Sequence, residues 1–459
     1  MNESRSDAAA RHCAAQFAEA VARFDPPGSI AVAVSGGSDS MALLHLAARW
    51  AAGARRSLRV LTVDHGLRPE AAAEAERVAE WAGALGLETH VLKWRGGAPG
   101  PRLQERARAA RYRLLASRCE AEGIGALLVG HTEDDVAETF LQRLARGAGL
   151  DGLAGMAPEI RIAAGPGAPI RLLRPLLGFS RAQLRGMLDG FRQTYLEDPS
   201  NADDAFERVR IRNARRAFAA LGLEFRDVAR SAARLRAARA ALDRSAAELF
   251  AQAGAFDDLG GARLGLAALR DADRAVAARC LRKAVAACAG TDHPPNEEKV
   301  AELLEAIFRA MRGPRRQFRA TLGGAVVEAD ADADADAVLL RREPAAVTGR
   351  MDGAAALAPA PIATGSALLW DGRFIVALEG QTAPEGQTDH AQERFVAPLG
   401  ERAVEFARGE DAKRLAAAPA IFANGEVLAA PGGRGARPEA AHFAFIGGEK
   451  LQFPGVIRF

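Results

Sequence analysis

The sequence predicts an α/β protein built on a doubly wound parallel sheet, followed by a helical domain and a small C-terminal α+β domain. Three observations support this fold class. Apolar runs of strand length alternate with helical stretches through the first 220 residues. Turns rich in glycine or acidic residues follow three of these runs. An alanine-rich helical pattern then extends over residues 224–311, and short strand-like runs return after it.

The predicted elements alternate along the first part of the chain. The expected strands are 30–34, 57–63, 89–94, 126–129 and 170–173. The expected helices are 1–25, 41–48, 69–86, 103–121, 133–145 and 178–192. Ligands of such sheets bind beyond the carboxyl ends of the strands. The turns at 35–40, 64–66 and 130–135 all follow strands, so we expect them to meet in one pocket.

Length and composition narrow the class of protein. A chain of 459 residues with 49% hydrophobic residues can form two to three domains with substantial cores. No apolar run reaches the length of a membrane span, and the acidic N-terminus lacks the apolar segment of a signal peptide, so a cytoplasmic location is expected. The four cysteines are scattered without a C-x-x-C, which argues against a disulfide framework, a zinc ribbon or an iron–sulfur site.

The loop SGGSDS, residues 35–40, separates an apolar β-branched strand from a helix. Gly36 and Gly37 allow the backbone to approach a phosphate, and the N–H groups of the next helix then face the anion. The chain has no G-x-x-x-x-G-K-[ST], so the loop suits a leaving pyrophosphate better than a γ-phosphate. The alternative is an ordinary strand–turn–helix corner. The position of Asp39, which could hold magnesium, favours the phosphate loop.

A second group of chemically active residues follows the strand at 126–129. On a helix beginning at Glu133, Asp134 and Glu138 share a face and Asp135 lies within the same turn, with His131 at the entrance. The alternative is simple capping of a helix N-terminus by acidic residues. Three carboxylates beside a phosphate loop favour metal or ammonium binding instead.

Arginines cluster after residue 200. They occupy positions 208, 210, 212, 215 and 216, and five more follow between 226 and 239. A run of charges is usually a solvated face. Beside a nucleotide pocket, the arginines are also typical of a track for nucleic-acid phosphates. We therefore expect Arg208, Arg210 and Arg212 to bind nucleic-acid phosphates.

Together these motifs resemble a known family. In order along the chain they are SGGSDS, VDHGLRPEA, ERARAARYRLL, GHTEDDVAETFLQRLARGAGLDGLAGM, RPLLGFSRAQL and LEDPSNADDAFERVRIRN. The loop is similar to that of the N-type (PP-loop) ATP pyrophosphatases, and the ordered set resembles bacterial tRNA(Ile)-lysidine synthetase over residues 30–216. Thr132 stands where members often have a second histidine.

The resemblance implies a reaction in two steps. ATP adenylates the C2 oxygen of the wobble cytidine in an isoleucine tRNA with a CAU anticodon, and the ε-amine of free lysine then displaces AMP to give lysidine. The residues implied to hold ATP and Mg²⁺ are Ser35, Gly36, Gly37, Ser38, Asp39 and Ser40, with Asp39 on the metal. His131, Asp135 and Glu138 are implied for adenylation and lysine binding, and Arg111 for the phosphates or the reacting base. Because the implied substrate is a tRNA, Arg208, Arg210 and Arg212 are expected to bind that RNA. Arg111 on a solvated helix face is the alternative.

The resemblance also divides the chain. It implies a catalytic domain at 1–220, a helical tRNA-binding domain at 221–315 and a C-terminal tRNA-binding region at 316–459. The Ala-, Gly- and Pro-rich composition near 344–365 predicts a linker there. Strand-like runs occur at 324–327, 338–342, 368–370, 374–378, 421–428 and 442–445. The acidic repeat at 328–336 is predicted to be a hairpin tip, with calcium binding as the weaker alternative.

Two other functions share these motifs. One is a different PP-loop tRNA-modifying enzyme such as a sulfurtransferase, against which the absence of paired cysteines counts. The other is a non-catalytic RNA-binding relative, against which the intact loop and carboxylates count. The expected partners are the tRNA and free lysine, with no membrane, and the sequence leaves open whether the chain forms a homodimer.

Overall fold

The computed structural model describes most of the chain in two units. The described residues are 2–26, 28–96, 100, 102–165, 169–197, 207–291, 294–314, 316–330, 336–349, 355–379, 394–435, 441–446 and 456–458. The first unit comprises residues 1–239 and 456–459, and the second comprises residues 240–455. The three-domain division expected from the sequence stays a prediction.

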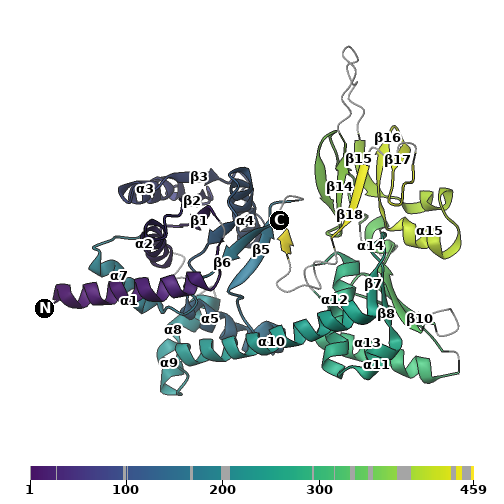
Figure 1. The fold of residues 1–459 in the computed structure, drawn as a ribbon, viewed down its shortest axis with the longest axis horizontal. Helices are drawn as coiled ribbons and strands as arrows, with labels where there is room; N and C mark the ends of the chain where they lie inside the picture. The colour runs from purple at the N-terminus through teal and green to yellow at the C-terminus, as the bar shows by residue number, and fades with distance from the viewer. Residues whose placement is uncertain are drawn as a thin grey trace, which may run out of the picture. The chain divides into compact units, whose positions relative to one another are not determined.

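Unit 1 is built on a seven-stranded sheet with the order β19-β5-β6-β4-β1-β2-β3 (Figure 1). Its strands are β1 (Ile30–Ala33), β2 (Leu58–Asp64), β3 (Thr89–Lys93), β4 (Ala126–Leu128), β5 (Glu159–Ala163), β6 (Ile170–Leu173) and β19 (Val456–Arg458). Every neighbouring pair is parallel except β5 and β6. The predicted mostly parallel sheet is therefore confirmed, whereas β5 had not been predicted.

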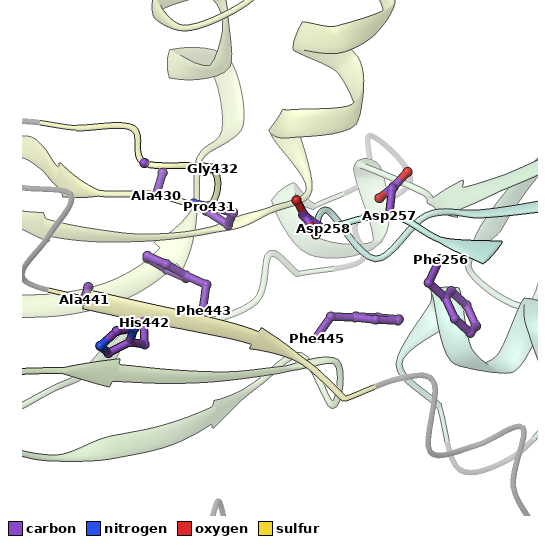
Figure 2. Close-up of a pocket in the computed structure, with 11 residues that line it drawn as sticks. Phe256, Asp257, Asp258, Ala430, Pro431, Gly432, Ala441, His442, Phe443 and Phe445 are labelled. Atoms are coloured by element: carbon purple, nitrogen blue, oxygen red, sulfur yellow. The ribbon is translucent and has the colours of Figure 1, made fainter.

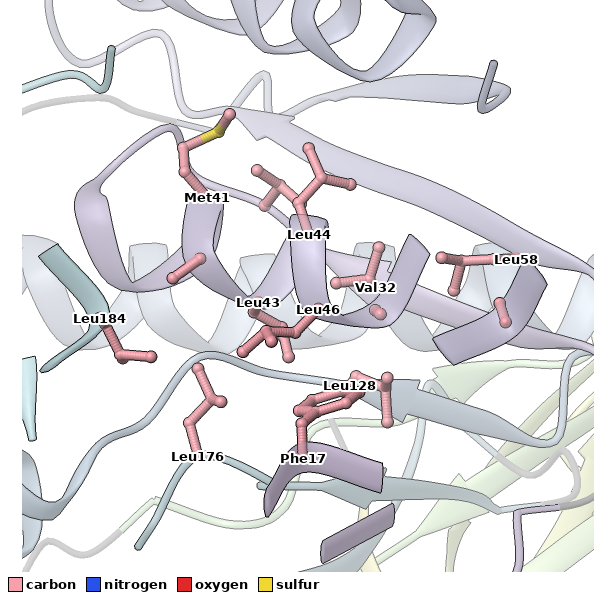
Figure 3. Close-up of a cluster of buried hydrophobic side chains, with 14 of the residues drawn as sticks. Phe17, Val32, Met41, Leu43, Leu44, Leu46, Leu58, Leu128, Leu176 and Leu184 are labelled. Carbon is pink, nitrogen blue, oxygen red and sulfur yellow. The ribbon is translucent and has the colours of Figure 1, made fainter. Parts of the chain in front are cut away.

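Helices cover both faces of this sheet. The helices of this unit are α1 (Asn2–Ala22), α2 (Ser38–Gly53), α3 (Ala71–Ala84), α4 (Leu103–Ala121), α5 (Glu133–Leu144), α6 (Leu150–Leu153), α7 (Arg181–Gly190), α8 (Glu207–Asn213) and α9 (Arg215–Ala220), and α10 (Phe225–Ala253) begins here and continues into unit 2. Ile30 and Val32 of β1 pack with α1, α2 and α7 in one core, whereas Ala31 packs with α4 in another. Figure 3 shows the first core, in which Phe17 and Val32 meet the leucines of α2. Because successive strand residues face opposite sides, the alternation makes the sheet doubly wound.

Unit 2 begins with a five-stranded antiparallel sheet covered by helices. The strands, β7 (Gly254–Phe256), β8 (Ala262–Gly265), β9 (Gln317–Leu322), β10 (Ala325–Asp330) and β11 (Ala337–Arg342), are arranged in the order β7-β8-β11-β10-β9. The helices are α11 (Leu266–Asp271), α12 (Arg274–Ala289) and α13 (Glu297–Arg312). The prediction of helix throughout 224–311 was wrong at β7 and β8. The pairing of β10 with β11 confirms a hairpin. The predicted tip at 328–336 was wrong for 328–330, which belong to β10, and 331–335 lie outside the described residues.

The remainder of unit 2 contains two small antiparallel sheets, β12-β15-β16-β17 and β13-β14-β18. Their elements are α14 (Ala345–Thr348), β12 (Ala360–Pro361), β13 (Ala367–Trp370), β14 (Phe374–Leu378), β15 (Arg394–Pro398), η2 (Gly400–Glu405), α15 (Gly409–Ala416), β16 (Pro419–Ala423), β17 (Glu426–Ala429) and β18 (Ala441–Phe445). The strand expected at 421–428 is instead a hairpin of β16 and β17. Within the described part of the chain, every helix is too short or too polar to cross a membrane.

Candidate active site

The loop after β1 turns sharply at Gly36. Its φ is +87°, and a Cβ atom there would lie 2.4 Å from Leu196 Cδ1, so the position favours glycine. Leu196 N donates to Gly36 O at 2.9 Å. Ser40 closes the turn, because its hydroxyl accepts from Ser35 N at 3.1 Å and donates to Gly37 O at 2.9 Å. Ser35 and Ser40 therefore shape the loop through their mutual contacts.

Gly37 is the N-cap of α2 and leaves the start of the helix accessible. A Cβ atom at Gly37 would meet only Ser35 Oγ, at 4.0 Å, so the space above it is open. Gly37 has no side chain to accept the first N–H groups of α2, which remain available for an anion. Gly130, at the end of β4, abuts this turn: a Cβ atom there would lie 3.1 Å from Asp39 O. The ends of β1 and β4 therefore meet as expected from the parallel sheet.

The acidic helix α5 begins with a capping box at Thr132. Asp135 Oδ2 accepts from both Thr132 N and Thr132 Oγ1 at 2.9 Å, and Asp135 N donates to Thr132 Oγ1 at 3.4 Å. One oxygen of Asp135, Oδ2, therefore caps the start of α5, as the capping alternative predicts. The other oxygen, Oδ1, is directed to arginines. The Asp135 carboxylate therefore both caps α5 and contacts the arginines of the site.

Arg181, the first residue of α7, joins the phosphate loop to α5. Its Nε donates to Asp39 Oδ2 at 2.9 Å, its Nη1 to Glu138 Oε1 at 2.8 Å and its Nη2 to Asp135 Oδ1 at 2.8 Å. Its backbone N–H donates to Asp134 Oδ2 at 2.7 Å. Asp39 and the carboxylates of α5 therefore belong to one site.

Arginines from α8 and α9 complete the cluster. Arg208 Nη2 donates to Asp135 Oδ1 at 2.9 Å, and Arg212 Nε donates to Glu138 Oε1 at 3.0 Å. Arg215 Nη1 donates to Asp134 Oδ1 at 2.6 Å. Arg210 is exposed, because it lies on the opposite face of α8 from Arg208 and Arg212. Two of the three arginines expected to bind RNA thus contact carboxylates in this structure.

The charges in this cluster shift the pKa values of its members. Burial raises the pKa of Asp39 above its ordinary value, although the guanidinium of Arg181 acts in the opposite direction. Burial alone would lower the pKa of Arg181, but Asp135, Glu138 and Asp39 outweigh it and raise that pKa. Arg181 is therefore a permanent cation.

His131 lies among arginines at the end of β4. Arg174 Nε donates to His131 Nδ1 at 3.3 Å, so Nδ1 must carry a lone pair and a neutral ring carries its proton on Nε2. Burial, together with Arg174, Arg108 and Arg111, places the pKa of His131 well below its ordinary value. His131 is accordingly a neutral hydrogen-bonding group in the free protein.

Arg111 is close to the same edge of the sheet. Its guanidinium lies 5.0 Å from the ring centroid of Tyr112, and Nη2 is 3.5 Å from the Tyr112 hydroxyl. Its charge also contributes to lowering the pKa of His65, after the effect of burial. His65 follows β2, and its Nδ1 is buried without a hydrogen-bond partner. The turns after β1, β2 and β4 thus lie at one edge, as the sequence predicts.

Sequence reasoning missed three functional candidates here. They are Arg181, Arg174 and His65. Arg181 and Arg174 stand in the quoted motif RPLLGFSRAQL, and His65 stands in VDHGLRPEA. Their positions were visible in the sequence, but the partners of Arg174 and Arg181 lie 17 to 142 residues away along the chain.

The donor set fits nucleotide-bound magnesium better than a metal held by protein alone. Among the described residues, no group of three or more histidine, cysteine or acidic side chains could hold a metal ion. Mg²⁺ bound with a nucleotide typically takes one or two carboxylates and completes its shell with phosphates and water. Asp39, directly beside the open helix N-terminus, can supply that carboxylate.

A separate cavity of about 490 Å³ lies in unit 2 (Figure 2). Phe256, Phe443 and Phe445 line it together with Asp257 and Asp258. Asp257 is already engaged there, since its Oδ1 accepts from Leu259 N and Gly261 N, both at 2.9 Å. None of the predicted catalytic residues lies in unit 2, so this cavity is not the candidate active site.

Comparison with known proteins identifies the family. A model of the PP-loop domain matches residues 9–215. A tRNA(Ile)-lysidine synthase from Rhodopseudomonas palustris is 41% identical over 313 residues, which cover 65% of this chain and 87% of that protein. Those from Methylobacterium nodulans and Ruegeria pomeroyi are 42% and 34% identical, over 68% and 92% of this chain and 91% of each relative. The chain therefore belongs to the tRNA(Ile)-lysidine synthase family.

Proposed function

We propose that this protein uses ATP to join lysine to C2 of the wobble cytidine in an isoleucine tRNA with a CAU anticodon. The observation that carries the proposal is the single guanidinium of Arg181, which bonds Asp39 of the phosphate loop and both Asp135 and Glu138 of α5. A loop suited to pyrophosphate and a group of carboxylates suited to an ammonium thus lie within one site.

In the first step, the C2 oxygen of the cytidine attacks the α-phosphorus of ATP. A phosphorus–oxygen bond forms, and the bond to pyrophosphate breaks. The open N-terminus of α2 holds the departing pyrophosphate, because Gly37 leaves its N–H groups free for an anion. Mg²⁺, held in part by Asp39, would neutralise charge on the phosphates. His131, after β4, and Arg111, on α4, stabilise the negative charge that develops by donating hydrogen bonds.

In the second step, the ε-amine of lysine attacks C2 and AMP leaves with the former C2 oxygen. The ammonium form of lysine must first lose a proton, and Asp135 or Glu138 is placed to accept it. In the free protein these carboxylates are bonded by Arg208 and Arg212. The ammonium therefore replaces an arginine from α8, and the displaced arginine becomes available to a tRNA phosphate.

The cysteines favour this reaction over sulfur transfer. All four, Cys13, Cys119, Cys280 and Cys288, are buried and unpaired. Burial raises the pKa of Cys119, Cys280 and Cys288 to about 12 and also raises that of Cys13. A sulfurtransferase needs a reactive thiolate, which these environments disfavour.

The decisive experiment supplies ATP, isotopically labelled lysine and the isoleucine tRNA, followed by mass analysis of the nucleosides. We expect labelled lysidine at the wobble position. A tRNA with uridine at that position and a reaction without lysine are the negative controls. A thiolated nucleoside, or pyrophosphate release with no labelled product, would reject the proposal. Complete absence of pyrophosphate release would favour the non-catalytic alternative.

Variants separate the two steps. Asp39→Ala is expected to abolish tRNA-dependent pyrophosphate release. Glu138→Ala should retain pyrophosphate release without lysine but lower kcat/KM for lysine by about 100-fold or more. Asp189→Ala, an exposed carboxylate on α7, is the matched control and should behave as wild type. Equal lysine dependence in Glu138→Ala and wild type would exclude Glu138 from the lysine pocket.

A further inference from the structure

Arg181 is held more firmly than the other arginines of the site. It begins α7, whose Leu184, Met187 and Leu188 are buried in the core with α1 and α2. The preceding residue, Ser180, caps the helix by accepting from Gln183 N at 3.2 Å. Arg181 N is itself bonded to Asp134. The backbone and the guanidinium are therefore both fixed.

The guanidinium uses its shape as well as its charge. Its three nitrogens each donate to a different carboxylate, at 2.8 to 2.9 Å, and those carboxylates come from α2 and α5. A guanidinium presents its donors in a rigid plane, whereas an ammonium is a point charge on a flexible stem. Lysine at position 181 would keep the charge but could not hold all three carboxylates in the same relation.

The remaining arginines are less confined. The side chain of Arg181 is 14% exposed, compared with 42% for Arg208 and 34% for Arg212. If Arg208 and Arg212 move away from these carboxylates, Asp39, Asp135 and Glu138 together carry three negative charges. The remaining positive charge is that of Arg181. The site then keeps a net charge of −2, which still attracts Mg²⁺ and an ammonium.

We propose that Arg181 is a positioning residue that couples the two half-reactions. It fixes the loop carboxylate that serves ATP relative to the helix carboxylates that serve the amine, so that the adenylated base and the nucleophile meet. This inference rests on the proposed function. Small displacements of reacting groups lower rates by about 100-fold. The loss of the Arg181 guanidinium is therefore measurable in the rates of both steps.

The test compares Arg181→Lys and Arg181→Gln with wild type. The matched control is Arg185→Gln, which removes an exposed arginine one turn later on α7 that stacks on Tyr195 at 5.8 Å. Pyrophosphate release without lysine measures adenylation, and lysine titration at saturating ATP and tRNA gives kcat and KM for transfer. Thermal melting by circular dichroism reports folding.

For Arg181→Lys we expect a melting temperature near that of wild type and a fall of about 30- to 100-fold in the rate of both steps, with KM for lysine within threefold. Arg181→Gln should lose at least as much, and Arg185→Gln should lose nothing. If the rates of both steps in Arg181→Lys are within threefold of wild type, a positive charge alone suffices at this position and the proposal is overturned. Loss confined to one step, or failure of both variants to fold, would also overturn it. If wild type makes no lysidine, the proposed function fails instead.

Discussion

Two adjacent glycines in the phosphate loop have different physical roles. Gly36 adopts a φ of +87° and bonds Leu196 N through its carbonyl, whereas Gly37 has a φ of −70° and borders open space. Any side chain can adopt the backbone of Gly37. Gly36 is thus required by the fold, and Gly37 by the space that a phosphate needs.

Gly36→Ala should therefore destabilise the protein. A left-handed conformation costs an L-residue about 1–2 kcal/mol, and the new methyl group would also crowd the Leu196 side chain, so we expect a loss of about 2 kcal/mol or more in urea unfolding. Gly37→Ala should change stability by less than about 0.5 kcal/mol but raise the KM for ATP. Equal stability of the two variants would contradict this assignment.

His131 should make stability depend on pH. Burial and the nearby arginines place the pKa of His131 in the folded protein well below its ordinary value. At mildly acidic pH the ring is therefore protonated in the unfolded chain but remains neutral in the folded protein. Stability is therefore present above about pH 6.5 and is lost as the pH falls below it, by up to about 1.4 kcal/mol per pH unit. His131→Gln should lack this loss in urea unfolding measured between about pH 5 and 8. Parallel pH profiles for the variant and wild type would refute the prediction.

The residues of the site differ in how far the sequence reveals them. Asp39, Asp135 and Glu138 follow parallel strands, and the rule that carboxyl ends share an edge was enough to bring them together. Arg181 could not be recognised, because its importance arises from partners on α2 and α5 rather than from its own neighbours. The α8 arginines were predicted as site residues, but their contact with carboxylates was not, because it depends on which face of the helix turns inward.

At the scale of elements, substitutions on the two faces of α8 should affect KM for tRNA and KM for lysine differently. Arg208 faces Asp135, whereas Arg210 is exposed on the opposite side. Arg210→Gln is expected to raise KM for tRNA and to reduce the slope of log affinity against log salt by about 1, with KM for lysine unchanged. Arg208→Gln should lower KM for lysine as well, because the ammonium no longer has to displace this arginine from Asp135. If Arg210→Gln shifts both constants equally, the division between faces is wrong.

The elements that were missed have identifiable causes. Gly254–Phe256 and Ala262–Gly265 lie in the stretch 254–265, whose four glycines are poor helix formers and interrupt the alanine-rich pattern on either side. These strands are short, and the pairing that completes them, of β8 with β11, comes from residues more than 70 positions later. Similarly, β5 contains Glu159 and Arg161 and becomes a strand through antiparallel pairing with β6. By contrast, α4 and β14 have the bounds that the sequence predicts, since their patterns are locally complete.

At the scale of the whole molecule, each unit has its own hydrophobic cores. The described clusters around β1 and α2 lie in unit 1, and those around α12 and β14 lie in unit 2. No described cluster contains residues of both units. The division falls after Arg239, within α10. Separate cores predict two unfolding transitions, because cooperativity depends on shared packing.

The unfolding transition of unit 2 can be identified by replacing a buried carboxylate in that unit. Asp243 is 2% exposed and bonds Arg279 Nε at 2.9 Å and Lys283 Nζ at 2.7 Å. Asp243→Ala removes the buried carboxylate shared by these two cations, of which Arg279 keeps Glu297 at 3.7 Å, so we expect a loss of about 3 kcal/mol confined to one transition in calorimetry. ATP should raise the other transition, because a ligand stabilises only the unit that binds it. Asp227→Ala, an exposed ion-pair partner on the same helix, is the control and should shift neither transition measurably. A single transition that responds to both ATP and Asp243→Ala would mean that the units unfold as one, and that the chain's division into cores does not govern its stability.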